Sequence, residues 1–461
     1  MTCKITEAIG RFVAETTFDE IPAKAIRTAR MGFIDFIGVM YAGREEEAPV
    51  ILDRVLAPLP GAATLCFSSR SAGAPEAAWI NGVAGHALDF DDVGVGGHPS
   101  TVIVPAILAV AQELNLSGED MLRAYAIGYE AWAELSLREP GSLHSKGWHP
   151  TGIWGAIASS AACAALHRLD AERATFAVAM GASMSAGVMA NFGTMTKPYH
   201  AGRAAHAGVM AARLAKAGFT SSPDAIEHPQ GLLAAVTPEN KVNRERESTI
   251  GEVWQLVEKG LNIKKYPACY CTHRAIDGML DLCREKGVQA GDIDHIIVSI
   301  SDRFSRILRN HNPQTGLEAK FSMEFTMASA AIAGRVSLSE LTDEFVQRPE
   351  VQELMRRVEL NLTNNYDPNH NNAALFDQVE VKLKSGESLK SSEVRFARGH
   401  AEIPLTDQDL AEKFSACVEY GNAESDTVGL LDRLLRMEDM SARDLLSGNA
   451  PAKDARTVSA V

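Results

Sequence analysis

Hydrophobic residues recur at helical spacing over most of the first 260 residues, which predicts one helix after another. The boundaries carry helix signals: Pro75 stands at one start, Ser117 and Asp120 form a capping pattern at a second, and Gly218 follows the helix that begins near Pro198. Ala and Gly are dense in these segments, and small residues let helices approach closely. We therefore expect a compact bundle with buried central helices.

The hydrophobic period changes after Pro267. Residues 295–301 alternate as a strand does, and residues 378–396 read as a hairpin with Ser385 and Gly386 in its turn. Helical patterns are interleaved with these strands, at residues 318–334 and 348–358. Such a mixture is typical of an α+β domain.

Helical spacing returns at residues 404–420, where Thr406 and Asp409 form a capping box. The predicted fold class is therefore mainly α, with a large all-helical domain formed by both chain ends and a smaller α+β domain inserted between them. The predicted boundaries are 1–265 for the first helical part, 266–402 for the α+β domain and 403–461 for the helical return. The final residues, 447–461, have the composition of a disordered tail.

Composition and charge narrow the possible partners. The chain has 461 residues, of which 46% are apolar and 23% charged, as in an ordinary globular protein of two or three domains. A formal net charge of -14 argues against a nucleic-acid partner, because such binders need a basic face. We expect no membrane partner, since no apolar run is long enough to span a bilayer. Seven scattered cysteines and no signal peptide indicate a reducing, cytoplasmic location.

Three candidate groups stand directly before a proline, namely His98, His149 and Lys197. Proline is favoured at the first position of a helix, so each of these side chains is predicted at or next to an N-cap. The free N–H groups and the positive dipole end at three such positions would bind carboxylates or phosphates. The alternative interpretation is that each proline only marks a helix start.

The segment "HALDFDD", residues 86–92, adds an acidic cluster. On a continuous helix His86, Asp89 and Asp92 share one face, and Asp91 points elsewhere. Asp89 is then a candidate to orient a catalytic histidine, with His98 the first choice. Asp89, Asp92 and a histidine could instead be metal ligands, although the spacing matches no strong metal motif. In a third interpretation these carboxylates face water at a helix end.

The segment "NIKKYPACYCTHRAIDG", residues 262–278, is the fourth candidate. We expect Lys264 or Lys265 at another helix start, where the lysine would reach an anion. Cys269 and His273 line the same stretch. With Cys271 and Cys283 they could form a zinc site, but C-x-C-x-H is not a standard zinc pattern.

These motifs together resemble the MmgE/PrpD family, which includes 2-methylcitrate dehydratase, cis-aconitate decarboxylase and iminodisuccinate epimerase. The matching segments occur in order from the first helix to about Gly399: "NGVAGHALDFDD…GHPS", "HPTGIWGA", "GTMTKPYHAGRAAHAG" and "KKYPACYCTHRAIDG". The resemblance implies a helical domain with an inserted α+β lid, a homodimer, and cofactor-free and metal-free chemistry on a small di- or tricarboxylate.

By position, the resemblance places the catalytic residues at Asp89, His98, His149, Lys197 and Lys264. Arg203, Cys269 and His273 are the predicted substrate-binding residues. Val93 replaces a threonine that the decarboxylase and methylcitrate branches share. Two further departures concern the decarboxylase branch: Cys269 replaces a histidine, and the lid tyrosine has no counterpart near Ile307. These departures favour other members of the family over a cis-aconitate decarboxylase.

The residue types suit removal of a proton next to a carboxylate. Negative charge then develops beside a group that is already negative, so the site needs cations and a base. Lys197, Lys264 and Arg203 are the candidate cations, and His98 or His149 is the candidate base. The leading interpretation is a hydro-lyase like 2-methylcitrate dehydratase, and the alternative is an epimerase. A metal-dependent hydrolase and a carboxylate-binding protein without activity are further alternatives.

Overall fold

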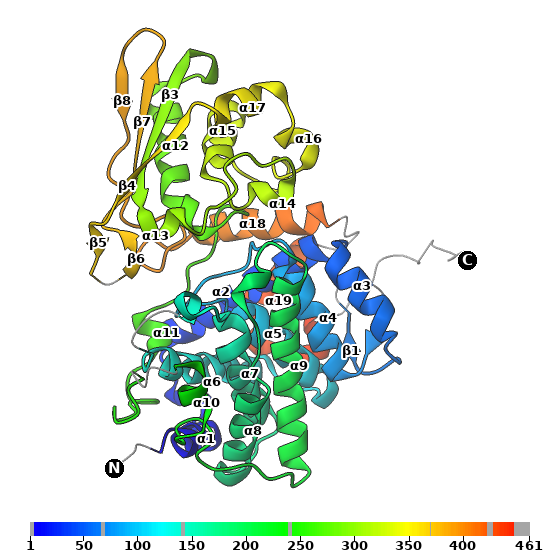
Figure 1. The fold of residues 1–461 in the computed structure, drawn as a ribbon. Coiled ribbons are helices and arrows are strands. Elements are labelled where there is room, and N and C mark those ends of the chain that lie inside the picture. The colour runs from blue at the N-terminus through cyan, green and yellow to red at the C-terminus, as the bar shows by residue number, and fades with distance from the viewer. Residues whose placement is uncertain are drawn as a thin grey trace. The chain divides into compact units, whose positions relative to one another are not determined.

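The computed structural model describes residues 4–65, 70–139, 143–237, 242–368, 370–421 and 427–446, so the tail predicted at 447–461 lies outside the described residues. The chain divides into two compact units. The first contains Met1–Ile263 and Thr406–Val461, and the second contains Lys264–Leu405. Figure 1 shows the elements of each unit.

The first unit is mainly helical, as predicted. Its α-helices are α1 (Ile5–Glu15), α2 (Ala23–Gly43), α3 (Glu47–Leu56), α4 (Ala74–Ala87), α5 (Ser100–Leu114), α6 (Gly118–Ser136), α7 (Pro150–Leu166), α8 (Ala171–Ser183), α9 (Thr196–Lys216), α10 (Leu232–Val236), α11 (Gln255–Glu258), α18 (Asp407–Tyr420), α19 (Thr427–Leu435) and α20 (Ala442–Leu445). The unit is not all-helical, because β1 (Ala63–Thr64) and β2 (Ser71–Ala72) pair in an antiparallel ladder.

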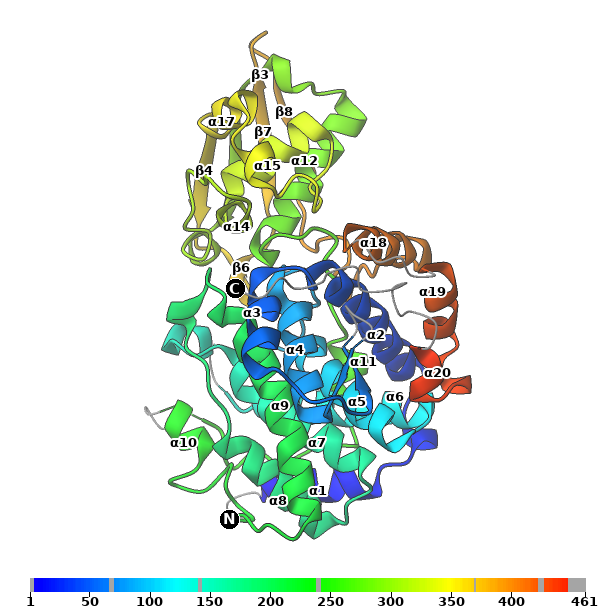
Figure 2. The same ribbon diagram turned by 90° about the vertical axis from the view of Figure 1, so that its right-hand side faces the viewer.

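The central helices of the first unit are buried on nearly every side. Every residue of α7 is buried, and α5 is buried from Ser100 to Gln112. Helices α4 and α9 lie side by side (Figure 2). A Cβ at Gly202 of α9 would lie 2.2 Å from the carbonyl oxygen of Trp79 in α4, so only glycine allows this approach. The small residues seen in the sequence therefore set the distance between these two helices.

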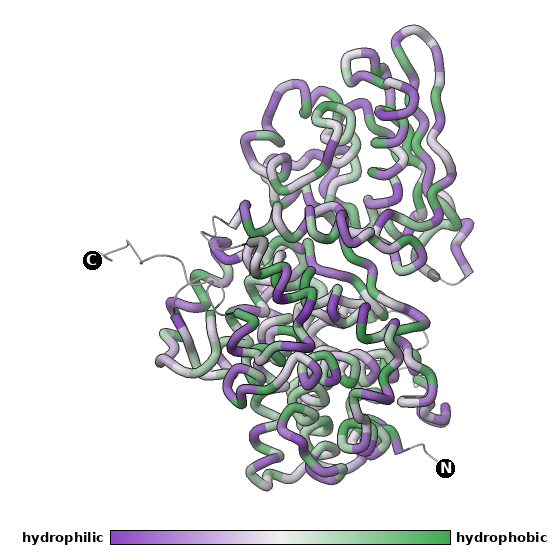
Figure 3. The backbone as a smooth tube through the Cα atoms, turned by 180° about the vertical axis from the view of Figure 1, so that it is seen from behind, coloured by the Kyte–Doolittle hydropathy of each residue, from purple (hydrophilic) through white to green (hydrophobic). Residues whose placement is uncertain are grey.

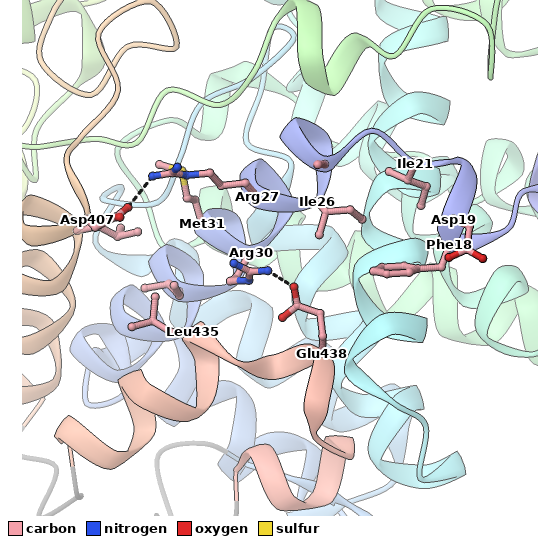
Figure 4. A pocket seen from close by; sticks show the side chains of 13 residues that line it. Phe18, Asp19, Ile21, Ile26, Arg27, Arg30, Met31, Asp407, Leu435 and Glu438 are labelled. Carbon is pink, nitrogen blue, oxygen red and sulfur yellow. Dashed lines mark hydrogen bonds and ion pairs between the residues drawn. The ribbon is translucent and has the colours of Figure 1, made fainter.

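The C-terminal segment returns to the first unit and packs against α2. Thr406 caps α18 and forms the predicted capping box with Asp409. Figure 4 shows two ion pairs that join this segment to α2, one between Arg30 and Glu438 and one of 2.9 Å between Arg27 and Asp407. Both chain ends therefore contribute to one helical unit.

The second unit is a four-stranded sheet with helices. Its elements are α12 (His273–Lys286), β3 (Ile293–Ser301), α13 (Asp302–Ser305), α14 (Gly316–Ala319), α15 (Met323–Ala333), α16 (Asp343–Val346), α17 (Pro349–Met355), β4 (Val358–Thr363), β5 (Tyr366–Asp367), β6 (His370–Ala374), β7 (Gln378–Leu383) and β8 (Ser388–Lys390). The strand order is β4-β3-β7-β8, with β3 and β4 parallel and the other two pairs antiparallel. Strands β5 and β6 form a separate antiparallel pair.

The sheet of the second unit buries one face under helices. Ile296, Val298 and Ile300 alternate into a core that also contains residues of α12 and α15. The predicted hairpin is confirmed as β7 and β8, and Gly386 in its turn has a φ of +91°. In Figure 3 hydrophobic and hydrophilic stretches alternate along the chain of each unit. None of the described helices combines the length and the apolar character that crossing a bilayer requires.

Candidate active site

The acidic segment is a loop and not the end of a helix. Helix α4 ends at Ala87, and Asp89 takes a φ of +53°, which no continuing helix allows. The prediction that His86, Asp89 and Asp92 share a helical face was therefore wrong. In the loop the roles are exchanged, and Asp91 is the carboxylate that faces the histidines.

Asp91 lies between two imidazoles. Its Oδ1 is 2.8 Å from Nδ1 of His86, and its Oδ2 is 3.0 Å from Nδ1 of His98. The side chains of Asp91 and His86 are completely buried, whereas 14% of the His98 side chain is exposed. An ionised carboxylate only accepts hydrogen bonds, so the proton of the His86 imidazole belongs on Nδ1, and the nearby Asp91 charge favours the same tautomer in His98. With the proton on Nδ1, Nε2 is the ring nitrogen of His98 that can act as a base.

Asp89 links His98 to Lys197. Nζ of Lys197 donates to Oδ1 of Asp89 at 2.6 Å, and the same oxygen lies 3.8 Å from Nε2 of His98. Both side chains of the Asp89–Lys197 pair are less than a tenth exposed. Nε2 of His98 therefore faces the buried Asp89–Lys197 ion pair. A carboxylate ligand could bind there by contacting the ammonium group of Lys197.

The three helix starts meet at this cluster. His149 is the N-cap of α7, and His98 precedes the N-cap of α5 by one residue, as predicted. Lys197 is the second residue of α9 and so lies two residues after the N-cap, one residue further into the helix than predicted. The backbone N–H of His98 donates to the Thr151 hydroxyl at 3.2 Å, which joins the starts of α5 and α7. The start of α9 joins the cluster because the ammonium group of Lys197 donates to Asp89.

His149 has a histidine partner of its own. Its Nδ1 lies 3.1 Å from Nδ1 of His200, so one ring donates and the other accepts. The His149 ring also packs edge-on against Phe192, with ring centroids 4.9 Å apart, and stacks on His86 at 5.9 Å. Nζ of Lys197 lies 5.3 Å from the centroid of the same Phe192 ring. His149 is therefore held beside both His86 and the lysine.

Burial keeps several of these histidines neutral. Burial, with a smaller effect from the charge of Lys197, lowers the pKa of His149 well below its usual value. Burial also lowers the pKa of His86 to about 4, although Asp91 acts in the opposite direction. The pKa of His200 is about 4, again first because of burial. At neutral pH these imidazoles are uncharged, which suits proton transfer.

The two neighbouring carboxylates of the loop have opposite pKa shifts. Burial alone would raise the pKa of Asp91, but His86 and His98 outweigh it and hold that pKa well below its usual value. Burial and the charge of Asp35 raise the pKa of Asp92 well above its usual value. Asp92 does not join the histidines, because its Oδ2 accepts from the Ser100 hydroxyl at 2.6 Å.

The predicted metal alternatives have different outcomes. Among the described residues, one group has ligand atoms close enough to hold a metal ion, and it contains His86, Asp89, Asp91 and His98. Asp92, a ligand in the predicted set, is not part of that group. The ammonium of Lys197 already occupies one carboxylate of the group, and a nearby cation opposes metal binding. The predicted absence of a metal requirement stays a prediction.

The remaining candidates of residues 262–278 belong to the second unit. Lys264 is 1% exposed and does not start a helix, because α12 begins only at His273, so that prediction was wrong. Nε2 of the buried His273 ring lies 3.2 Å from the carbonyl oxygen of Ala268. Cys269 is also buried, and its thiol is hydrogen-bonded to that of Cys271. A role in catalysis or substrate binding stays a prediction for Lys264, Cys269 and His273.

The structure does not support the zinc alternative. Cys269, Cys271, His273 and Cys283 are all described, and they do not come together as a set of ligands. Arg203, the other predicted binding residue, lies on α9 next to His206, whose ring packs 4.7 Å from that of Trp79. Its contact with a substrate also stays a prediction.

The sequence did not predict three contacts of the cluster: His86 with Asp91, Asp91 with His98, and His200 with His149. Lys197 and His200 are three residues apart on one helix, which places them on one face and could have indicated His200. Asp91 points away from His86 and Asp89 only on a continuous helix, and α4 ends before it, at Ala87. The glycines at 94, 96 and 97 mark a loop soon afterwards and could have warned of its end.

Comparison with known families decides the relationship. The MmgE/PrpD N-terminal domain matches residues 7–245, and the MmgE/PrpD C-terminal domain matches residues 266–435. The chain belongs to the MmgE/PrpD family. The resemblance read from the motifs is thereby confirmed.

Curated MmgE/PrpD relatives match over almost the whole chain. A cis-aconitate decarboxylase of Homo sapiens is 27% identical over 474 residues, which cover 98% of this chain and 96% of the relative. The cis-aconitate decarboxylase of Mus musculus is 25% identical and covers 97% and 93%. That of Aspergillus terreus is 23% identical and covers 95% and 94%. These matches therefore extend over both family domains of this chain.

Proposed function

We propose that this protein is a lyase that acts on a small di- or tricarboxylate by removing a proton next to a carboxylate, without a cofactor. The observation that carries the proposal is the line from Asp91 to His98 and on to the Asp89–Lys197 pair. In this arrangement the His98 ring lies next to a buried ion pair, which supports a base acting beside a cation. Membership of the MmgE/PrpD family supports a reaction of this class.

His98 is the proposed base. Asp91 faces Nδ1 and keeps the proton there, so that Nε2 accepts the proton from the substrate carbon. The imidazolium that forms is stabilised by the Asp91 charge at 3.0 Å. His98 is more exposed than the other predicted catalytic residues of the cluster, Asp89, His149 and Lys197, so a ligand can reach it.

Lys197 is the proposed anchor of the substrate carboxylate. Its ammonium group lies at the start of α9, near the starts of α5 and α7, where the helix dipoles also favour an anion. As the proton leaves, electron density moves from the carbon into this carboxylate. A cation already in place then stabilises the added charge.

His149 is the proposed proton donor. In the hydro-lyase reaction the C–H electron pair forms the new C=C bond, and the C–O bond breaks. Nε2–H of a neutral His149 protonates the leaving hydroxyl, which departs as water. His200 passes its Nδ1 proton to Nδ1 of His149 and takes a proton from solvent at its own Nε2, so both rings stay neutral. The proton on His98 returns to solvent in the next step. An epimerase would use the same two histidines on opposite faces of one carbon.

Decarboxylation is the second candidate reaction. It is favoured by the cis-aconitate decarboxylases that match over nearly the full chain. Cys269, which differs from the histidine expected in that branch, counts against it, whereas Val93 departs from the decarboxylase and methylcitrate branches alike. A homodimer, as the family resemblance implies, belongs to the proposal in either case.

Product analysis tests the function. The purified chain is incubated with citrate, 2-methylcitrate, cis-aconitate and other small polycarboxylates, and products are identified by mass spectrometry. Loss of water from a hydroxylated substrate supports the hydro-lyase, whereas loss of carbon dioxide from cis-aconitate supports the decarboxylase.

The matched variants for this test are His149→Ala and His167→Ala, because the two histidines stand at opposite ends of α7. We expect turnover to fall about 100-fold or more in the first variant and to stay near normal in the second. Turnover by the wild-type chain on none of these substrates would contradict the proposed function.

A further inference from the structure

A lysine from the C-terminal return reaches the loop that carries Asp89 and Asp91. Nζ of Lys413, on α18, donates to the backbone carbonyl of Phe90 at 2.9 Å and lies 3.9 Å from the centroid of the Phe90 ring. Its third partner is Asp35 of α2, at 2.5 Å. The Asp35 side chain is fully buried and only 7% of the Lys413 side chain is exposed. One ammonium group therefore holds both the backbone and the ring of Phe90.

Phe90 is the residue between Asp89 and Asp91. Its neighbours on either side face the Lys197 ammonium and the two imidazoles, so their positions depend on where Phe90 lies. A loop usually gains such precision from a rigid support. Here the support is a buried cation between two helices that come from opposite ends of the chain.

The same loop is fastened at a second point. The backbones of Val93 and Asn262 exchange two hydrogen bonds, of 2.9 and 2.8 Å. Asn262 stands one residue before Ile263, where the chain leaves the first unit, and α18 follows the return at Thr406. Both segments by which the chain leaves and re-enters this unit therefore hold the loop.

We propose that Lys413 is a positioning residue that fixes Phe90 and thereby sets Asp89 and Asp91 in their working positions. As a statement about catalysis it rests on the proposed function. A displacement of about 1 Å in such groups costs up to about 100-fold in rate. The competing explanation is that Lys413 only neutralises the buried carboxylate of Asp35.

Three variants separate these explanations. Lys413→Met removes the ammonium group but leaves Asp35 buried without its cation, which itself threatens folding. The double variant Asp35→Asn/Lys413→Met removes both charges and so avoids that cost. Lys24→Met is the matched control, since Lys24 also donates to a backbone carbonyl of the first unit, that of Val257 at 3.1 Å.

The first measurement is hydrogen exchange of the full chain without ligand, followed in peptides that cover residues 88–98. We expect exchange there to be about tenfold faster in the double variant than in wild type, and unchanged in Lys24→Met. If Lys413 only neutralised Asp35, the double variant would regain wild-type exchange. That outcome overturns the proposal.

The second measurement is steady-state kinetics on the substrate found by product analysis. We expect kcat to fall at least about tenfold in the double variant with little change in KM, because binding by Lys197 is kept. Faster exchange with an unchanged kcat would contradict a positioning role. If wild type turned over no polycarboxylate, the proposed function would fail, while the exchange data would still decide whether Lys413 holds the loop.

Discussion

The bridge between His86, Asp91 and His98 allows a sharp test, the substitution Asp91→Asn. The carboxylate offers one accepting oxygen to each imidazole, at 2.8 and 3.0 Å. An amide of the same shape offers one oxygen and one NH2 group. Only one of the two imidazoles can then keep its proton on Nδ1.

The size of the effect follows from this count. If the NH2 group faces His98, the tautomer reverses and Nε2 carries a proton, so the ring cannot act as a base. If the oxygen faces His98, the tautomer survives but the negative charge that stabilises the imidazolium is lost. In either orientation we expect kcat to fall about 100-fold or more, which corresponds to about 2.7 kcal/mol in the activation free energy.

The adjacent carboxylate supplies the control. Asp92 is equally buried, but its pKa is raised well above the usual value, first by burial, and its partner is Ser100. Asp92→Asn therefore changes a buried carboxyl group of the same loop that does not contact the histidines. We expect its kcat to stay near wild type, with circular dichroism showing that both variants are folded. Equal losses of kcat in the two variants would refute the assignment of Asp91 as the partner of His98.

Three further predictions concern binding, pH and metals. Lys197→Met should raise KM at least about tenfold, because a substrate carboxylate loses a charge-assisted hydrogen bond, and unchanged KM and kcat would place Lys197 outside the site. Burial raises the pKa of Glu130 to about 7, above the value near 4.3 in an unfolded chain, so wild type loses stability as pH rises from about 4 to 7. Glu130→Gln does not titrate, and urea unfolding should show it gaining about 2 kcal/mol relative to wild type between pH 5 and pH 8; an identical pH dependence would contradict the raised pKa. Activity should survive EDTA, and a loss that a divalent ion restored would instead make Asp89 and Asp91 metal ligands.

Local signals predicted many elements of the fold. Ser117 caps α6, and Thr406 forms a capping box, because these bonds involve residues only three apart. The hairpin of β7 and β8 follows likewise from alternation and a glycine turn. The end of α4 could not be found this way. The apolar pattern continues past Ala87, while the loop is held by distant residues such as Lys413.

The candidate site shows the same division. Proline placed His98 and His149 at helix starts from local sequence alone. Their partners are set by tertiary packing: Asp89 and Lys197 are 108 positions apart and meet because α4 and α9 approach closely at Gly202. No spacing rule reaches over that distance, so the exchange of roles between Asp89 and Asp91 became visible only in the structure.

Exchange of substrate hydrogen with solvent tests the central claim most directly. Wild type and His98→Ala are incubated in deuterated water with a panel of di- and tricarboxylates, and label in the recovered substrate is measured by NMR. We predict deuterium at a carbon next to a carboxylate with wild type, and label slower by about 100-fold or more with His98→Ala. Equal labelling by the two proteins would contradict proton abstraction by His98.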